Sequence, residues 1–356
     1  MGAHDVIFST NNYATRKKWA KELFRGILPD VEFNSLIGTD SNSPIQIKTD
    51  LGKGEGDEIT FTIRYPLSGE GEVGQETVEG NEEKMAFDNF KCTIEELNHA
   101  VDTGGKMDEQ RVPWSLLSEG KMALQDWWAQ RLTNYMFATL CGDSSYKMAG
   151  HTFAQACEEP DTYHMITPGD VTESSLAESD MMDLTFLDRM KQRAETMAIY
   201  GSPNEIGMNS GAYHKIRPLR IKGKNYYRVI LHTYVYDRLR QNMNLGQLGD
   251  LKRLAGDYDI SDIEFEYNGL LISKSDRIRT VYTNIYRNII FGAQAAVFAW
   301  GGAGESKSTT MAFVPYEKDA KRFVMIRGGG IFGMKKVRFA SVDSGVIVAP
   351  TYGKAL

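Results

Sequence analysis

The sequence predicts an α+β fold, on the basis of the order in which its hydrophobic patterns occur. A segment with the two-residue alternation of a β-hairpin comes first, two segments with helical periodicity follow, and short strand-like segments fill the rest of the chain. Strands and helices therefore fall in separate regions, whereas a βαβ protein would alternate them regularly.

The composition is that of a water-soluble globular protein. The 356 residues are 42% hydrophobic and 25% charged, and at roughly 150 residues per domain this length suggests two domains. No apolar run approaches the ~18 residues of a membrane-spanning helix, so we expect no membrane partner. Three cysteines without C-x-x-C spacing argue against a disulfide framework and a zinc site, and they suit a reducing compartment.

An N-terminal arm is predicted ahead of the hairpin. Thr15–Ile27 has the spacing of a short helix, with apolar residues on one side and basic residues on the other. Pro29 and a polar stretch follow, so this helix is not expected to join a core. The candidate contact residues of the arm are Arg16, Lys17, Lys18, Trp19, Lys21 and Arg25.

A hairpin with a long tip is predicted next. Asp57–Tyr65 alternates apolar and polar residues, Pro66 ends the strand, and Phe90, Cys92 and Ile94 repeat the alternation. The residues between the two strands are rich in glycine and glutamate and have almost no apolar periodicity. Tips of this length are uncommon in compact domains unless they have a function, so we expect this one to project from the body.

The charges of the chain are unevenly distributed, in two blocks of opposite sign. The net charge of −6 excludes a nucleic-acid binder that depends on an overall positive field. Residues 55–88 hold ten acidic and two basic side chains, and residues 215–253 hold ten basic and two acidic ones, so the local charges are −8 and +8. Such blocks favour head-to-tail association between copies, although a charged run is often only a solvated surface. The candidate contact residues are Glu70, Glu72, Glu76, Glu79, Glu82, Glu83 and Lys84 in the acidic loop, and Arg217, Arg220, Arg228, Arg238 and Arg240 in the basic block.

Two helices are predicted after the hairpin. Pro113 opens a segment that continues to about Cys141 with apolar residues at helical spacing, and Gly142 stands in the usual C-terminal position. The residues expected on its inward face are Leu117, Leu124, Trp128, Leu132 and Tyr135. Asp180–Tyr200 is predicted to be the second helix, because helical periodicity ends there at a Gly-Ser-Pro sequence.

Short strands are predicted for the remainder of the chain. They are Asn204–Met208, Tyr226–His232, Ile263–Ser273, Ile289–Trp300, Val337–Ala340 and Gly345–Ala349. Asn268-Gly269 is the sequence of a tight turn, so Ile263–Ser273 is expected to form a hairpin.

Two glycine-rich segments resemble nucleotide-binding motifs but lack the necessary context. Gly69–Gly74 matches G-x-G-x-x-G, yet glutamates surround it and no helical pattern follows to receive a phosphate. Gly301–Ser308 resembles a P-loop, but Ser306 replaces the glycine before Lys307, and Pro315 lies where a helix should continue. A P-loop-like nucleotide-dependent enzyme stays open as the alternative function, and ATP turnover abolished by Lys307→Ala would favour it.

No arrangement of histidines indicates catalysis. The six histidines are scattered, and neither H-E-x-x-H nor G-x-S-x-G occurs. We therefore predict no catalytic residue, no metal ligand and no cofactor.

The order of these parts resembles the tailed-bacteriophage major capsid proteins of the Hong Kong 97-like fold. That family also has a basic arm, a long acidic hairpin, a long helix opened by proline and a following α+β portion. Three segments add to the resemblance: Glu205–Tyr213 resembles the family's central strand and next helix, Phe291–Gly301 its late apolar segment, and Gly345–Pro350 its closing strand. The resemblance covers nearly the whole chain.

The resemblance implies a division of the chain by position. Residues 1–47 would be the N-arm, 54–103 the extended loop (E-loop), 104–201 the peripheral domain with a spine helix at 113–141, 202–327 the axial domain, and 328–356 the return to the peripheral domain. No motif identifies the residues of the family's lysine–asparagine cross-link.

The resemblance also implies a structural function. The chain would be a major capsid protein that self-assembles as hexamers and pentamers into the icosahedral head of a tailed phage around double-stranded DNA. The implied partners are a separate scaffolding protein, because no long scaffolding segment precedes the arm, a portal protein, a decoration protein, and the packaged DNA through sequence-independent contacts. The implied locations are the virion capsid and, during assembly, the host cytoplasm.

Overall fold

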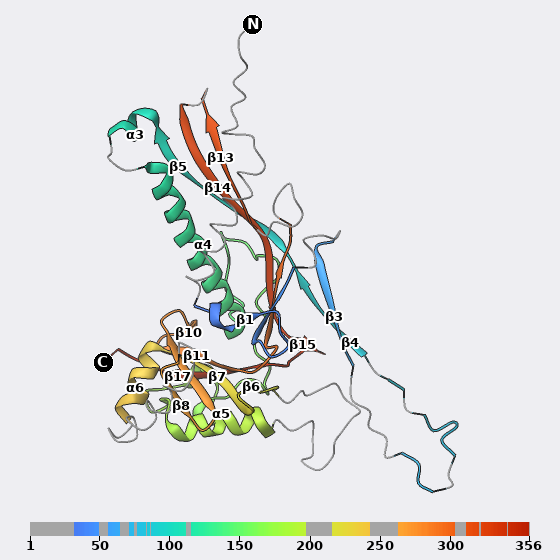
Figure 1. The fold of residues 1–356 in the computed structure, drawn as a ribbon. Coiled ribbons are helices and arrows are strands. Elements are labelled where there is room, and N and C mark those ends of the chain that lie inside the picture. The colour runs from blue at the N-terminus through green and yellow to red at the C-terminus, as the bar shows by residue number, and fades with distance from the viewer. Residues whose placement is uncertain are drawn as a thin grey trace.

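The computed structural model consists of two β-sheet bodies and a hairpin that extends away from both (Figure 1). It describes residues 32–49, 56–64, 71–74, 77–82, 84–85, 87–111, 115–196, 216–242, 263–302, 311–319, 322–339 and 341–355. The predicted arm helix Thr15–Ile27 and the predicted strand Asn204–Met208 lie outside these residues. In the described part, no helix is both long and apolar enough to cross a membrane.

The first body is a six-stranded sheet with a long helix on one face. Its strands are β1 (Ile37–Gly38), β2 (Ile45–Lys48), β12 (Ala296–Trp300), β14 (Phe323–Lys336), β13 (Met311–Lys318) and β5 (Glu95–Gly105). They pair in the order β1-β2-β12-β14-β13, and β5 also pairs with β14. After α3 (Lys106–Arg111), the helix α4 (Leu116–Cys141) lies along β5 and β14 (Figure 1).

The ends of α4 follow from its sequence. Ser115 caps the N-terminus by accepting a hydrogen bond from the Ser118 amide, and Gly142 closes the C-terminus in the left-handed conformation (φ 68°), which a glycine adopts without a steric penalty. The helix therefore begins at Leu116, slightly later than predicted, because the serine and not Pro113 provides the cap. Four of the predicted inward residues are buried, and Leu117 is half-buried.

The second body is a seven-stranded sheet covered on one face by two shorter helices. Its strands are β6 (Leu219–Ile221), β7 (Lys224–His232), β8 (Phe265–Tyr267), β9 (Leu270–Ser275), β10 (Thr280–Tyr282), β11 (Ile285–Phe291) and β17 (Val346–Tyr352). The helices α5 (Leu184–Thr196) and α6 (Thr233–Asn242) share a core with Val229 and Leu231 of β7. Ile230 and Ile289 point to the opposite face, where they join the core around α4.

Smaller elements complete the described structure. They are the hairpin strands β3 (Glu58–Arg64) and β4 (Phe87–Thr93), the short pair β15 (Arg338–Phe339) and β16 (Val342–Asp343), and three 3₁₀ turns, η1 (Asn34–Leu36), η3 (Pro168–Asp170) and η4 (Glu173–Ser175). The turn predicted at Asn268-Gly269 is confirmed, because both residues have positive φ and connect the antiparallel strands β8 and β9.

The apolar run Ile289–Trp300 is two strands and not one, so that prediction was wrong. β11 ends at Phe291 in the seven-stranded sheet, and β12 begins at Ala296 in the six-stranded sheet. Residues 292–295 turn between the sheets, with Gln294 in the left-handed conformation (φ 58°). Gly292 and Gln294 interrupt the run, but the residues on either side, Ile289–Phe291 and Ala296–Trp300, are all apolar and buried, so the sequence does not show that they belong to different sheets.

The predicted domain boundaries do not follow the two sheets. β17, expected to return to the peripheral domain, pairs with β11 in the seven-stranded sheet. β12 and β13, assigned by position to the axial domain, belong to the six-stranded sheet, and α5, assigned to the peripheral domain, covers the seven-stranded one. Each sheet takes strands from several of the predicted ranges, because the chain passes between the two bodies several times.

Candidate functional site

The base of the β3–β4 hairpin is fixed to the body by a small apolar cluster. Opposite residues of the antiparallel pair share a face, so Phe61 and Phe90 lie on the same side as Cys92. Phe90 and Cys92 are buried against Val297 and Ala299 of β12. The hairpin ends at Thr93, because the following strand β5 belongs to the six-stranded sheet. The predicted loop range of 54–103 thus includes most of β5.

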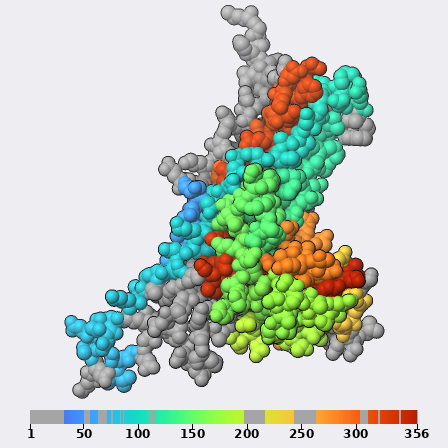
Figure 2. Space-filling view, turned by 180° about the vertical axis from the view of Figure 1, so that it is seen from behind, coloured from blue at the N-terminus to red at the C-terminus, as the bar shows by residue number. Residues whose placement is uncertain are grey.

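The tip of the hairpin exposes large apolar side chains. It extends well beyond the two sheets (Figures 1 and 2). Val73 is 81% exposed, Val78 62%, Met85 59% and Phe87 57%. A projecting segment that exposes four large apolar side chains is a candidate for a surface that another molecule covers.

The acidic residues of the tip are also exposed, and two of them stabilise its turn. Glu72 accepts a hydrogen bond from the side-chain amide of Asn81 at 2.8 Å, and Glu82 accepts one from the Gly80 amide at 3.0 Å. Glu79 and Lys84 are exposed as well. The remaining predicted residues of the loop, Glu70, Glu76 and Glu83, lie outside the described residues.

The predicted basic residues do not form one surface. Arg217 and Arg220 are exposed near β6, where Arg217 donates to the side chain of Gln294 at 2.9 Å. Arg240 is exposed at the end of α6, and Arg238 is half-buried there. In Figure 1, α6 and the described tip of the hairpin lie on opposite sides of the molecule, so this helix does not contact the tip of its own chain.

Arg228 was predicted to lie on the contact surface, and the structure corrects this prediction. Its residue is only 2% exposed in the middle of β7, so it is not available to a neighbouring subunit. The sequence placed it among surface residues because it belongs to a basic block, but β7 is covered on both faces, and charge alone does not show where a side chain points.

The last part of the range 1–47, predicted to be the N-arm, packs on the body in the structure. Its candidate residues between Arg16 and Arg25 lie outside the described residues, but the segment from Glu32 is part of the body. Phe33 is fully buried with its ring 4.5 Å from that of Phe137 in α4, and β2 pairs in parallel with β12. Glu32 accepts a hydrogen bond from Ser275 at 2.6 Å and forms an ion pair with Arg277 at 3.2 Å.

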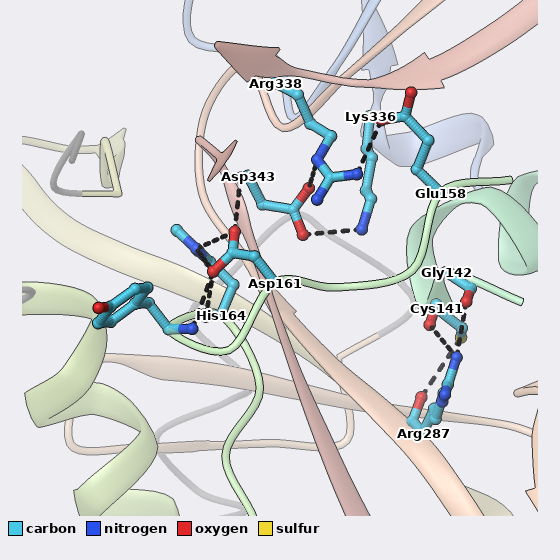
Figure 3. Close-up of polar contacts among 10 residues, drawn as sticks. Cys141, Gly142, Glu158, Asp161, His164, Arg287, Lys336, Arg338 and Asp343 are labelled. Atoms are coloured by element: carbon cyan, nitrogen blue, oxygen red, sulfur yellow. Dashed lines mark hydrogen bonds and ion pairs between the residues drawn. The ribbon is translucent and has the colours of Figure 1, made fainter. Parts of the chain in front are cut away.

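A buried cluster of charged side chains lies where the two bodies meet (Figure 3), and the sequence did not reveal it. Lys336, the last residue of β14, is 2.7 Å from Asp343, and both side chains are 1% exposed. Arg338 lies 2.9 Å from Asp343 and 3.0 Å from Glu158, which also forms an ion pair with Lys335 at 3.2 Å. Burial raises the pKa of Asp343 and lowers that of Lys336, while their mutual attraction opposes both shifts.

Asp161 and His164 continue this cluster toward the seven-stranded sheet. Asp161 accepts a hydrogen bond from the Asp343 amide at 2.7 Å, and its carboxylate lies 2.8 Å from Nδ1 of His164. Burial favours a higher pKa for Asp161, but the hydrogen bond and charge of His164 prevail and lower it to about 2. Val348 of β17 donates its amide proton to the carbonyl of His164 at 2.8 Å, so the segment is attached to the sheet edge.

A second buried ion pair lies at the C-terminal end of α4, and its arginine attaches this helix to the seven-stranded sheet. Arg287 of β11 forms a two-pronged pair with Glu173, with both nitrogen–oxygen distances 2.7 Å. Its third nitrogen donates to the carbonyl of Gly142 at the end of α4 at 2.6 Å (Figure 3). The signal for both ionic sites in the sequence is a basic residue in a largely apolar strand, as at Arg287, or at its end, as at Lys336.

The P-loop-like segment leads into a strand and not a helix. β12 ends at Trp300, and the next described element is β13, which begins at Met311. A phosphate-binding loop of this type requires a helix at that position. Lys307 lies outside the described residues.

The family comparison matches most of the chain to phage capsid proteins. A family model described as "Phage capsid protein" matches residues 8–259. A relative named "Major capsid protein" from Pseudomonas phage KPP25 is 22% identical over 318 residues, which are 83% of this chain and 77% of the relative.

Solved structures agree with this match. The capsid of Ralstonia phage GP4 superposes with a TM-score of 0.79 at 25% identity, over 91% of this chain and 92% of that one. The Cyanophage Pam1 capsid has a TM-score of 0.69 at 15% identity, over 92% and 93% of the two chains. The acid-stable capsid of Helicobacter pylori bacteriophage KHP30 has a TM-score of 0.63 at 14% identity, over 91% of each chain.

Proposed function

The chain belongs to the phage capsid protein family, and from that premise we propose that its projecting β3–β4 loop is the part that binds a neighbouring copy in the shell. The protein is a major capsid protein with the Hong Kong 97-like fold, a structural protein of the icosahedral virion capsid and not an enzyme. The findings give no support to the nucleotide-dependent alternative.

The exposed apolar side chains of the loop carry this proposal. Val73, Val78, Met85 and Phe87 are each more than half exposed on a segment that extends beyond its own body. Fully burying one such side chain contributes about 1.5–3 kcal/mol. A contact of this kind, repeated for every subunit of a closed shell, supplies cohesion that a single isolated pair would lack.

The charges of the loop have a different role in the proposal. Glu72, Glu79 and Glu82 remain near solvent and steer the loop toward basic residues of the neighbour, with Arg217, Arg220, Arg238 and Arg240 as the candidates. Arg228 is removed from this set because it is buried. The apolar side chains then contribute most of the affinity.

We assign the remaining parts of the shell protein to the two sheet bodies. We propose that the six-stranded sheet with α4 is the peripheral domain, α4 being the spine helix, and that the seven-stranded sheet with α5 and α6 is the axial domain around which hexamers and pentamers form. The basic arm contacts packaged DNA without sequence preference. A scaffolding protein, a portal protein and a decoration protein are the further partners proposed, with assembly in the host cytoplasm.

The test replaces the apolar side chains of the loop without changing its charge. The combined substitutions Val73→Ser, Val78→Ser, Met85→Ser and Phe87→Ser should leave the thermal midpoint of the free subunit unchanged, because these residues are exposed. The variant should form no shells in light scattering and electron microscopy. A matched control carries Met107→Ser and Met122→Ser, two residues of similar exposure on the body, and should assemble normally. Shells of normal yield from the loop variant would refute the proposal.

A further inference from the structure

The chain contains a single Asn-Gly sequence, Asn268-Gly269, which forms the turn between β8 and β9. Asparagine loses its side-chain amide as ammonia most readily before glycine, because glycine has no side chain to keep its backbone nitrogen away from the asparagine. Asn268 is exposed, so water has access to it. Spontaneous deamidation therefore has one favoured site in this chain.

Deamidation at this turn requires no reactant other than water. The backbone nitrogen of Gly269 attacks Cγ of Asn268 and gives up its proton, and the side-chain nitrogen leaves as ammonia. A cyclic imide remains, and water opens it at either carbonyl to give aspartate or isoaspartate. In isoaspartate the main chain runs through the former side chain and is longer by a carbon atom.

Two side chains of α5 hold the amide of Asn268. Asp188 accepts a hydrogen bond from Nδ2 at 2.9 Å, and Lys191 donates one to Oδ1 at 2.9 Å. These partners fix the orientation of the amide, since an ionised carboxylate only accepts and an ammonium only donates. Tyr267 positions Asp188 by donating to its second oxygen, also at 2.9 Å. We therefore expect Cγ of Asn268 to turn toward the nitrogen of Gly269 only when the contacts with α5 break.

The backbone of the turn has no room for a longer chain. Asn268 and Gly269 have positive φ values of 46° and 75°, and Tyr267 pairs with Leu270 on either side of them. In such a two-residue turn an added atom shifts the register of the strands. Isoaspartate at position 268 would therefore separate β9 from β8, an edge strand of the described sheet. It would also displace Phe265, which is fully buried in the core that α5 and α6 share.

We propose that Asn268 is the site at which the subunit deamidates, and that Asp188 and Lys191 slow this reaction by holding its side chain. While both contacts are made, the amide stays away from the backbone nitrogen that would attack it. Each loss of the contacts gives the reaction an opportunity, and the isoaspartate product cannot return to the original pairing. The site thus limits how long a subunit keeps its seven-stranded sheet intact, and it does not depend on how the loop binds a neighbour.

Peptide mapping of the folded subunit by mass spectrometry tests the proposal. After incubation at mildly alkaline pH, the peptide that contains Asn268 is scored for the mass gain of an amide converted to a carboxylic acid. The double variant Asp188→Ala and Lys191→Met should gain this mass at least about fivefold faster than the unmodified protein, a factor that corresponds to about 1 kcal/mol. Gln192→Ala, which replaces the exposed neighbour of Lys191 on α5, should convert at the unmodified rate. Equal rates in the double variant and the unmodified protein would overturn the proposal.

The unmodified protein provides a second test that needs no variant. In urea the contacts with α5 are lost, so Asn268 should convert faster than in the folded subunit at the same pH and temperature. Equal rates in the two states would show that neither α5 nor the turn protects Asn268, and earlier conversion of another asparagine in the folded subunit would reject Asn268 as the favoured site.

Discussion

The amide of Gly292 donates a hydrogen bond to the carbonyl of Gly345 at 3.2 Å, at the place where two connections between the sheets pass each other. One connection joins β11 to β12, and the other joins β14 to β17. A Cβ atom on Gly345 would lie 2.5 Å from the Cα atom of Ala295, and one on Gly292 would lie 2.0 Å from the carbonyl oxygen of Arg217. Glycine is required at both positions because backbone atoms, which cannot rotate away, occupy the space.

Gly345→Ala is therefore expected to destabilise the subunit. Inserting a methyl group into packed backbone costs about 1–3 kcal/mol, and urea unfolding of the free subunit would measure it. Gly105→Ala is the matched control, since its Cβ would meet nothing nearer than the ring of Phe323 at 3.3 Å, and its effect should be clearly smaller. Equal stability of Gly345→Ala and the unmodified protein would show that the two connections can separate without cost.

The ion pair between Arg287 and Glu173 gives a second prediction. The side chains are 5% and 9% exposed, and Glu173→Gln would leave a buried guanidinium without its counter-charge, at a cost of about 3–5 kcal/mol. Asp319→Asn removes the partner of Arg322 in an exposed pair and should cost less than about 1 kcal/mol. Denaturant unfolding of the two variants compares them directly, and similar losses would contradict the buried role of Glu173.

Acid stability should depend on Asp161. Its pKa is about 2 in the folded protein against an ordinary value of 3.8, so the unfolded chain takes up this proton first as the pH falls. The stabilisation is complete above about pH 4 and is lost as the pH falls to about 2; a shift of this size corresponds to about 2 kcal/mol. Asp161→Asn should be less stable at neutral pH and should lose less stability across that interval. The test measures the thermal midpoints of the unmodified protein and of Asp161→Asn from pH 6 to pH 2. If the two midpoints decline in parallel, Asp161 is not involved.

The elements with a local signal could be predicted from the sequence. The hairpin at Asn268-Gly269 was predicted from its turn residues, and the end of α4 from Gly142, because in both places the conformation is set by the residues themselves. The alternation of Ile59 and Phe61 likewise indicated a strand with one buried face. The projecting tip was expected from its composition, and it does extend from the body.

The parts that depend on distant contacts could not be predicted. Nothing near Phe291 indicates that the next strand joins another sheet, and nothing near Val346 indicates that it pairs with β11. The partners of Lys336 and Arg287 are seven and more than a hundred residues away, on segments without regular periodicity. The loop was assigned its contact role from charge, whereas its exposed apolar residues are scattered singly among polar ones and give no periodic signal.

The separate roles of charge and apolar contact in the loop lead to a prediction about salt. Steering by charge acts over distance and is screened by ions, with a Debye length of ~8 Å at physiological ionic strength, whereas apolar burial is not screened. Raising the salt concentration should therefore slow the assembly of shells while leaving their final yield nearly unchanged. The double variant Arg238→Glu and Arg240→Glu should assemble slowly at low salt and approach the unmodified rate at high salt, because salt screens the reversed charges. Both residues lie on α6, and the only ion pair described for them is that of Arg240 with Asp237, at 4.0 Å. Time-resolved light scattering at several salt concentrations distinguishes rate from yield. A final yield that falls steeply with salt would mean that the charges, and not Val73, Val78, Met85 and Phe87, hold the neighbouring subunits together.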